Sequence, residues 1–269
     1  TGSDPLVVEM TREGFPVLDG IRPFLKAVNC LFNFRDFAAR TPSEPPELPA
    51  GAQLNLNDHS PGEAEALAFL ASAGITVVQA HPASGWPEVV AVMEQLEYPV
   101  VLKTAMPGVQ HKTELDGVRL GLGNEQELKS AYDDLASRLG PEVLVSPMVE
   151  HAGLEMLLGM VRDPQFGPLV IMGFGGVQVE SLQDTVCALP PIDADTAMRL
   201  LQKLKNRDLF KHQRNNQKPD LRSFCNMAAL FSVLVAECGK GIETIDINPV
   251  IVSESGSIAV DALIIGSNT

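Results

Sequence analysis

Helix-like and strand-like hydrophobic patterns follow one another over most of the chain. Apolar residues recur at helical spacing near 63–73, 86–97, 125–139, 194–206 and 221–237. Short apolar or alternating runs lie near 75–78, 99–103, 117–122, 143–145, 154–161 and 168–172, and a final apolar hairpin follows. Because helices and strands mix without a regular period, the pattern predicts an α+β fold rather than a doubly wound parallel sheet.

The first 62 residues are organised differently. A strand-like run at Leu6-Val7-Val8 and an amphipathic helix from about Ile21 predict a short leading segment over residues 1–40. Residues 41–62 contain five prolines and two glycines, which predicts an extended linker. We therefore expect the main domain to span residues 63–269.

Charge and composition exclude several classes of partner. The chain has 34 acidic against 20 basic residues and a formal net charge of -14, so we expect neither nucleic acid nor a membrane surface as a partner. The four cysteines, Cys30, Cys187, Cys225 and Cys238, form no C-x-x-C pair and are interpreted as reduced core thiols of a cytoplasmic protein. Because it begins without methionine, the sequence is interpreted as a piece of a longer protein.

The common glycine-rich phosphate-binding motifs, the P-loop and the Rossmann turn, are absent from the sequence. Gly173-Phe174-Gly175-Gly176 follows an apolar strand, where glycines allow backbone N–H groups to approach an anion closely. A plain glycine turn between two strands explains the same residues. Both interpretations stay open on the glycines alone.

The C-terminal hairpin places polar side chains together. Centring its turn between Glu254 and Ser255 sets Asn248 opposite Asp261, with Asp246 on the same face. Carboxylate and amide oxygens are ligands that Mg²⁺ accepts together with phosphate oxygens. The alternative is a solvated face of an edge hairpin.

Two lysines raise the question of an anion. Lys103 ends the apolar run Pro99–Lys103, and its ammonium group must reach water or a negative charge. Lys112 and His111 follow within a loop flanked by glycine and proline. A strand-end lysine in water and two ordinary loop residues are the simpler alternatives.

Taken in order, these motifs resemble one family. The matching stretches are YPVVLK, HKTELDGVRLGL, VLVSPMV, GLEMLLGMVRDPQFGPLVIMGFGGVQVE and ETIDINPV followed by VDALI. They are similar to the ATP-grasp domain of the ADP-forming (NDP-forming) acyl-CoA synthetases, relatives of the succinyl-CoA synthetase β subunit. The resemblance covers roughly residues 55–265, and the leading segment is similar to the end of the CoA-ligase domain in fused members.

The resemblance implies an ATP-grasp fold that binds ATP or ADP and Mg²⁺ between two α+β subdomains. It implies that Lys103 reaches the nucleotide phosphates and that the segment with His111 and Lys112 closes over them. The remaining residues that it implies are the adenine-reading segment Ser146, Pro147, Met148 and Val149, Glu155 at the ribose, Gly175 and Gly176 in the glycine loop, and Asn248 and Asp261 at the metal.

The implied reaction interconverts acyl-CoA, ADP and phosphate with a carboxylic acid, CoA and ATP through a phosphohistidine in the CoA-ligase part. His111 is the candidate for a second histidine that relays the phosphoryl group. The implied partners are the CoA-binding and CoA-ligase domains of the same chain or of a partner chain.

Two departures from the family pattern favour an alternative function. Cys187-Ala188 stands where the family usually has Phe-Arg, and His212–Asn215 keeps an arginine but loses the two glycines around it. The alternative is a non-catalytic, nucleotide-sensing or structural module of a fused protein such as a protein acetyltransferase. A carboxylate-amine ligase shares the fold but fits the GFGGVQVE and DINPV stretches poorly.

Overall fold

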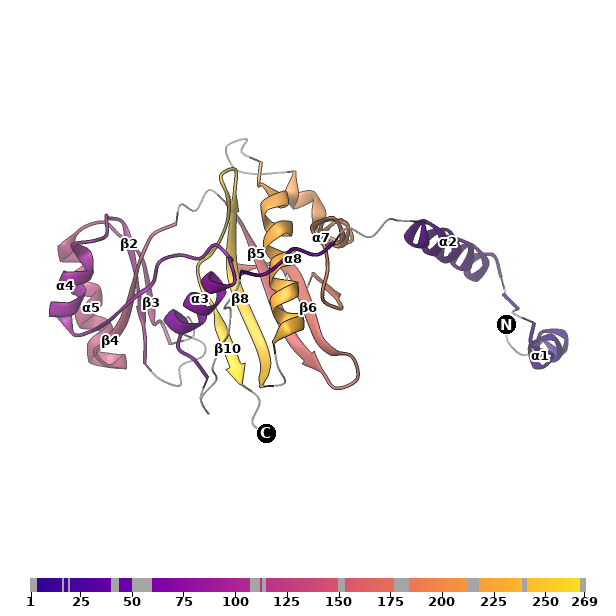
Figure 1. The fold of residues 1–269 in the computed structure, drawn as a ribbon, viewed down its shortest axis with the longest axis horizontal. Coiled ribbons are helices and arrows are strands. Elements are labelled where there is room, and N and C mark those ends of the chain that lie inside the picture. Colours follow the sequence, from indigo (N-terminus) through magenta and orange to yellow (C-terminus); the bar gives the residue numbers. More distant parts are fainter. Residues whose placement is uncertain are drawn as a thin grey trace. The chain divides into compact units, whose positions relative to one another are not determined.

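The computed structural model describes residues 4–15, 17–18, 20–39, 44–49, 60–106, 112, 115–149, 153–176, 184–211, 218–238 and 241–266 (Figure 1). The chain divides into two compact units, residues 1–43 and 44–269. Among the residues described, no helix combines the length and the apolar character needed to cross a membrane.

The first unit consists of two helices, α1 (Pro5–Arg12) and α2 (Ile21–Ala38). The side chain of Asp4 accepts a hydrogen bond from the Leu6 N–H at 2.9 Å, and Pro5 occupies the first helical position. These start signals outweigh the strand preference of Val7 and Val8, so the predicted strand at residues 6–8 is wrong. Neither helix buries a residue within the described chain.

The small subdomain, residues 81–147, has a four-stranded sheet with two helices on one face (Figure 1). Its strands run in the order β1-β4-β2-β3. Their side chains form a core with the two helices, to which Val100, Leu102, Leu128, Leu135 and Val145 contribute. The elements are β1 (His81–Ser84), α4 (Trp86–Met93), β2 (Val100–Thr104), β3 (Val118–Leu122), α5 (Glu125–Leu139) and β4 (Glu142–Pro147).

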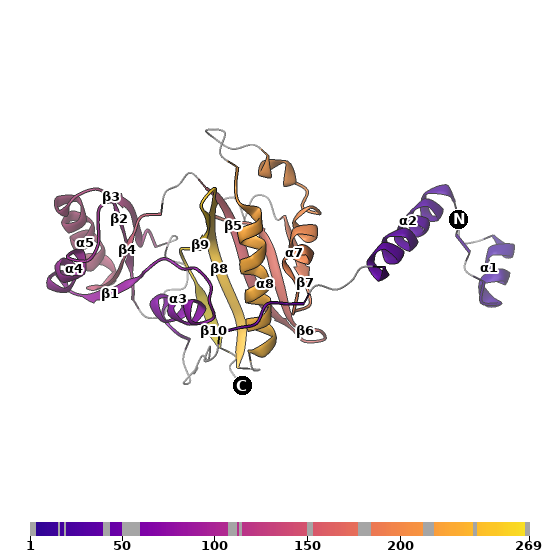
Figure 2. The ribbon, with the colours of Figure 1, turned by 45° about the horizontal axis from the view of Figure 1, so that its top comes forward.

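The large subdomain contains a second sheet, ordered β10-β8-β5-β6-β7, with β9 paired to β8. Helix α8 packs along one face of it, and α3 lies beside β10 (Figures 1 and 2). The elements are α3 (Glu63–Ser72), β5 (Leu154–Asp163), β6 (Gly167–Phe174), β7 (Thr185–Ala188), α7 (Ala194–Leu201), the 3-10 helix η2 (Arg207–Phe210), α8 (Leu221–Glu237), β8 (Ile242–Ser253), β9 (Gly256–Ala259) and β10 (Leu263–Gly266).

The predicted α+β class is confirmed, because every ladder between the described strands is antiparallel. Several details differ from the sequence prediction. Residues 75–78 form no strand, and Val77 makes only an isolated bridge to Ala259. The short strands β1 and β7 were not predicted. Cys30 and Cys187 are exposed, so only Cys225 and the half-buried Cys238 fit the prediction of core thiols.

Asp184 fixes the turn between α7 and η2. Its carboxylate accepts hydrogen bonds from the N–H groups of Lys205 at 2.9 Å and Asn206 at 2.7 Å. Burial alone would raise the pKa of Asp184, but these N–H donors outweigh that effect and hold the pKa below its usual range. The ionised carboxylate is therefore part of the folded structure.

We expect Asp184→Asn to lower the free energy of unfolding by about 1–3 kcal/mol at pH 7, because a backbone donor loses its acceptor. A depressed folded pKa contributes stability above the unfolded value of about 4 and loses it as the pH falls through the folded pKa. Urea unfolding of parent and variant at pH 7 and near pH 3 should therefore show a difference that shrinks in acid. A difference independent of pH would contradict this account of Asp184.

Candidate functional site

The alternation of side chains along β2 determines where Lys103 points. Val100 and Leu102 pack toward the helices of the small subdomain, so Val101 and Lys103 occupy the opposite face of the sheet. That face is covered as well, because Lys103 is only 7% exposed. The interpretation of Lys103 as a strand-end lysine in water is therefore wrong.

The ammonium group of Lys103 donates to three acceptors of the protein. It contacts Glu63 Oε1 at 2.6 Å, the carbonyl oxygen of Val260 at 2.9 Å and Asp261 Oδ2 at 2.9 Å. Burial alone would lower the pKa of Lys103, but the charges of Asp261 and Glu63 outweigh burial and raise the pKa above its usual range. Lys103 is thus a buried cation that joins the small sheet to α3 and to the segment after β9.

Lys112 meets the same carboxylate. Its ammonium group donates to Glu63 Oε2, so the two oxygens of Glu63 hold one lysine each. The loop position of Lys112 is fixed by the Gly117 N–H, which donates to the Lys112 carbonyl at 2.8 Å, while Thr104 N–H donates to the Gly117 carbonyl at 2.8 Å. His111, the residue before Lys112, lies outside the described residues.

Glu63 was not predicted as a site residue. It is the first residue of α3, and its side chain is 4% exposed. An acidic residue in the first turn of a helix is common, because it complements the helix dipole, so its sequence context offers no reason to place it at a ligand site. Only its burial and its two cationic partners mark Glu63 as part of the site.

On the large sheet, side-chain alternation places Glu155 and Asn248 on the face opposite the helices. Met156 and Leu158 on β5 pack into the helix-covered core, as do Ile245 and Ile247 on β8. The residues adjacent to them in sequence, among them Glu155, Asp246 and Asn248, therefore occupy the other face of the sheet.

The glycine loop after β6 is attached to these strands. Gly175 N–H donates to the Glu155 carbonyl at 2.8 Å, and Gly176 N–H donates to Asn248 Oδ1 at 2.8 Å. Gly176 has φ +65°, and a Cβ there would lie 1.4 Å from Glu155 Oε2. The left-handed backbone conformation therefore favours glycine at position 176, and a Cβ there would displace the Glu155 carboxylate.

The predicted hairpin register is confirmed. Val250 pairs with Ala259 and Ser253 with Gly256. Val260 N–H also donates to the Pro249 carbonyl at 3.2 Å, so the same register continues to the positions of Asn248 and Asp261. Both side chains offer oxygens of the kind that a hard divalent cation accepts. No cluster of three or more His, Cys, Asp or Glu that could hold a metal occurs among the described residues.

The predicted adenine-reading segment, residues 146–149, runs from the small core to the large one. Ser146 pairs with Val101 and is 5% exposed. Met148 N–H donates to the Pro99 carbonyl at 3.0 Å, whereas Val149 packs against the core of the large subdomain. The segment that includes Pro147 therefore links the two subdomains beside the strand that carries Lys103.

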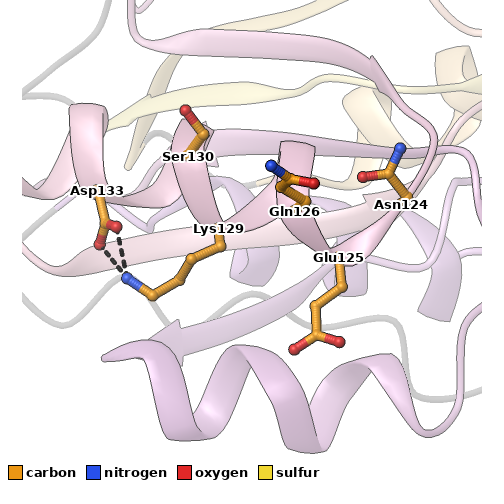
Figure 3. A pocket seen from close by; sticks show the side chains of 6 residues that line it. All are labelled: Asn124, Glu125, Gln126, Lys129, Ser130 and Asp133. Carbon is orange, nitrogen blue, oxygen red and sulfur yellow. Dashed lines mark hydrogen bonds and ion pairs between the residues drawn. The ribbon is translucent and has the colours of Figure 1, made fainter.

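A surface pocket elsewhere contains none of these residues. It lies over the exposed face of α5 and is lined by Asn124, Glu125, Gln126, Lys129, Ser130 and Asp133 (Figure 3). Its lysine, Lys129, pairs with Asp133 and lies over the Trp86 ring, 5.2 Å from the centroid. None of the charged side chains that line this pocket is buried, so we do not assign it to the functional site.

Replacing Lys103 by methionine should destabilise the fold. Within the described ion pairs, the variant leaves the carboxylate of Glu63 with one cation and that of Asp261 with none. Breaking a buried ion pair costs about 3–5 kcal/mol. We expect the free energy of unfolding to fall by about 3 kcal/mol. Urea unfolding measures it through the fluorescence of Trp86, the single tryptophan.

Lys211→Met is the matched control for this variant, because it removes an exposed lysine whose ion pair, with Asp208, lies at the surface. In this control we expect the free energy of unfolding to change by no more than about 0.5 kcal/mol. Equal effects of the two substitutions would contradict a buried role for Lys103.

Comparisons with known proteins identify the family of the chain. A family profile described as the ATP-grasp domain matches residues 53–265. The β subunit of acetate–CoA ligase (ADP-forming) I from Pyrococcus furiosus is 31% identical over 211 residues, covering 76% of this chain and 90% of that protein. Acetate–CoA ligase (ADP-forming) I from Archaeoglobus fulgidus is 34% identical over 206 residues, covering 74% of this chain but 30% of that longer protein.

Solved structures give the same result. Acetyl-coenzyme A synthetase 1 of Ca. Korarchaeum cryptofilum, in complex with coenzyme A and Ca-AMPCP, superimposes with a TM-score of 0.73 at 31% identity, covering 78% of this chain and 94% of that one. The same synthetase with Mg-AMPPCP gives a TM-score of 0.68 at 32% identity, covering 78% and 93%. The chain therefore belongs to the ATP-grasp family, and the part that it shares with these relatives is the ATP-grasp part of ADP-forming acyl-CoA synthetases.

Proposed function

We propose that this chain binds ATP or ADP between its two subdomains and passes a phosphoryl group between the nucleotide and a histidine, as the ATP-grasp part of an ADP-forming acid–CoA ligase. One observation carries the proposal above the others. The ammonium group of Lys103 is buried on the face of the small sheet that the helices of the small subdomain do not cover. A second cation, Lys112, lies beside it. Buried cations of this kind suit phosphate groups.

The neighbouring segments supply the other contacts that a nucleotide needs. The backbone of residues 146–149 would bind adenine, because it connects the two subdomains next to β2. Glu155 would bind the ribose hydroxyls, and the loop at Gly175 and Gly176 would approach the phosphates closely. Hydrogen bonds from the two glycine N–H groups to the Glu155 carbonyl and Asn248 Oδ1 fix the position of this loop, and these donors must be released before they can bind phosphate.

Asn248 and Asp261 would hold Mg²⁺ together with phosphate oxygens. The amide oxygen of Asn248 accepts one hydrogen bond, from Gly176, and has a second lone pair. The carboxylate of Asp261 likewise accepts from Lys103 through Oδ2 and has further acceptor capacity. A bound magnesium ion would neutralise phosphate charge during transfer.

The proposed chemistry is phosphoryl transfer to His111. An imidazole nitrogen of His111 attacks the γ-phosphorus of ATP, the bond to the bridging oxygen of ADP breaks, and phosphohistidine and ADP result. Lys103 and Lys112 would balance the phosphate charge during this step. In support, Lys112, the residue next to His111, lies at the carboxylate that also holds Lys103.

The complete reaction requires more than this chain. We propose that CoA-binding and CoA-ligase domains, in the same chain or in a partner, supply the acyl chemistry and choose the carboxylic acid. The β-subunit name of the Pyrococcus furiosus relative supports this arrangement. We also propose a cytoplasmic location, consistent with four cysteines that form no disulfide.

Isothermal titration calorimetry should show tighter ATP binding with Mg²⁺ than without it. In Asp261→Asn we expect the ratio of the two dissociation constants to fall toward 1, because the carboxylate that the metal uses has been removed. Asp133→Asn, an exposed aspartate of α5, is the matched control and should keep the parent ratio. An unchanged ratio in Asp261→Asn would remove this residue from the metal site.

Phosphorylation distinguishes the enzyme from the alternative nucleotide-sensing module. After incubation with Mg-ATP labelled at the γ position, the parent should carry acid-labile phosphate on His111, and His111→Asn should carry none there. His212→Asn is the control and should behave as the parent, because the proposed transfer does not use it. ATP binding without any phosphate on His111 would favour the non-catalytic module, which the departures at Cys187-Ala188 and His212–Asn215 also favour.

A further inference from the structure

Glu63 occupies the position between the two lysines of the site. Its Oε1 accepts from Lys103 and its Oε2 from Lys112, and the side chain is 4% exposed. Among the residues that the structure describes, it is the one carboxylate with ion pairs to both lysines. A separate element, α3, thus brings a negative charge to the point where the two cations meet.

The hydrogen bonds of Lys103 leave no room for a phosphate oxygen. An ammonium group has three N–H donors, and those of Lys103 have acceptors in Glu63, Val260 and Asp261. A phosphate can bind this group only when one acceptor leaves.

Glu63 is the acceptor whose departure frees both lysines. The Val260 carbonyl belongs to backbone held by the hydrogen bond from the Val260 N–H to Pro249, and Asp261 pairs with Lys103 alone among the described ion pairs. Glu63 instead holds the lysines through a side chain with three rotatable bonds. Rotation of that side chain would free a donor on each of the two lysines without moving a strand.

The balance of charges at the site also indicates Glu63. Lys103 and Lys112 are balanced by Glu63 and Asp261, so the ion-paired cluster carries no net charge. A polyphosphate is attracted to the lysines and repelled by both carboxylates. An anion that replaces the Glu63 carboxylate finds two cations already positioned.

We propose that Glu63 is a positioning residue of the nucleotide site, whose carboxylate holds Lys103 and Lys112 in place until the nucleotide phosphates replace it. The proposal rests on the proposed function, since it requires phosphates to bind at these lysines. Nucleotide affinity is then lowered by the cost of releasing Glu63. Removing the charge of Glu63 therefore strengthens binding, the opposite of what loss of a structural ion pair does.

The test is calorimetric titration of Glu63→Gln with ATP in the absence of Mg²⁺. Glutamine keeps the length and one carbonyl acceptor but removes the charge, so we expect the dissociation constant to fall at least about fivefold. Glu65→Gln is the matched control. It makes the same charge change two residues along α3, where the side chain only caps the Gly62 N–H, and its affinity should equal that of the parent.

Each outcome separates this proposal from the proposed function. Binding by the parent together with equal or weaker binding by a folded Glu63→Gln overturns the role of Glu63 and leaves the nucleotide site in place. No binding by either protein, whether Mg²⁺ is absent or present, overturns both, because the variant offers freed cations. Binding by the variant alone supports Glu63 as a strong competitor of phosphate.

Glu63→Asp is the second variant, in case glutamine prevents folding. It keeps the buried charge but is one methylene shorter, so its carboxylate cannot reach both lysines as well as glutamate does. We expect tighter ATP binding than in the parent, by a smaller factor than for glutamine. Weaker binding by a folded Glu63→Asp would also overturn the proposal.

Discussion

The architecture of the site depends on a single buried cation. Lys103 is placed by strand alternation on the face of the small sheet that its helices do not cover, and a buried ammonium group must be neutralised there. Its acceptors come from α3 and from the segment after β9, in the large subdomain. The need to satisfy one charge therefore fixes which elements of the two subdomains meet.

Side-chain alternation and strand register explain the glycine loop and the hairpin. On the large sheet, alternation along β5 and β8 turns the side chains of Glu155 and Asn248 away from the helix-covered core, and both residues accept N–H donors of the loop at Gly175 and Gly176. The continuing register of β8 and β9 then places Asp261 beside Lys103. Polar groups from distant parts of the sequence meet because two sheets present their uncovered faces.

Local signals predicted much of this fold. The helix over residues 125–139, the strand before Lys103 and the hairpin register all follow from hydrophobic period and turn chemistry, which act within a few residues. Turn position alone is sufficient to set Asn248 opposite Asp261. The strand expected at residues 6–8 is wrong because the cap by Asp4 and the following proline, which are equally local signals, favour a helix more strongly than Val7 and Val8 favour a strand.

Long-range contacts explain what sequence reasoning missed. Glu63 stands 40 residues before Lys103, and its pattern is that of any acidic residue at a helix start. The residues around it give no indication that its carboxylate is buried between two lysines. Such a residue is found only when the packing of α3 against the rest of the domain is known.

The most direct test of the central claim, that this charged cluster binds nucleotide phosphate, is a crystal structure of the chain with Mg²⁺ and a non-hydrolysable ATP analogue. The account predicts phosphate oxygens within hydrogen-bond distance of the ammonium groups of Lys103 and Lys112, with the Glu63 carboxylate turned away. A nucleotide bound elsewhere, with all three protein acceptors still on Lys103, would contradict it.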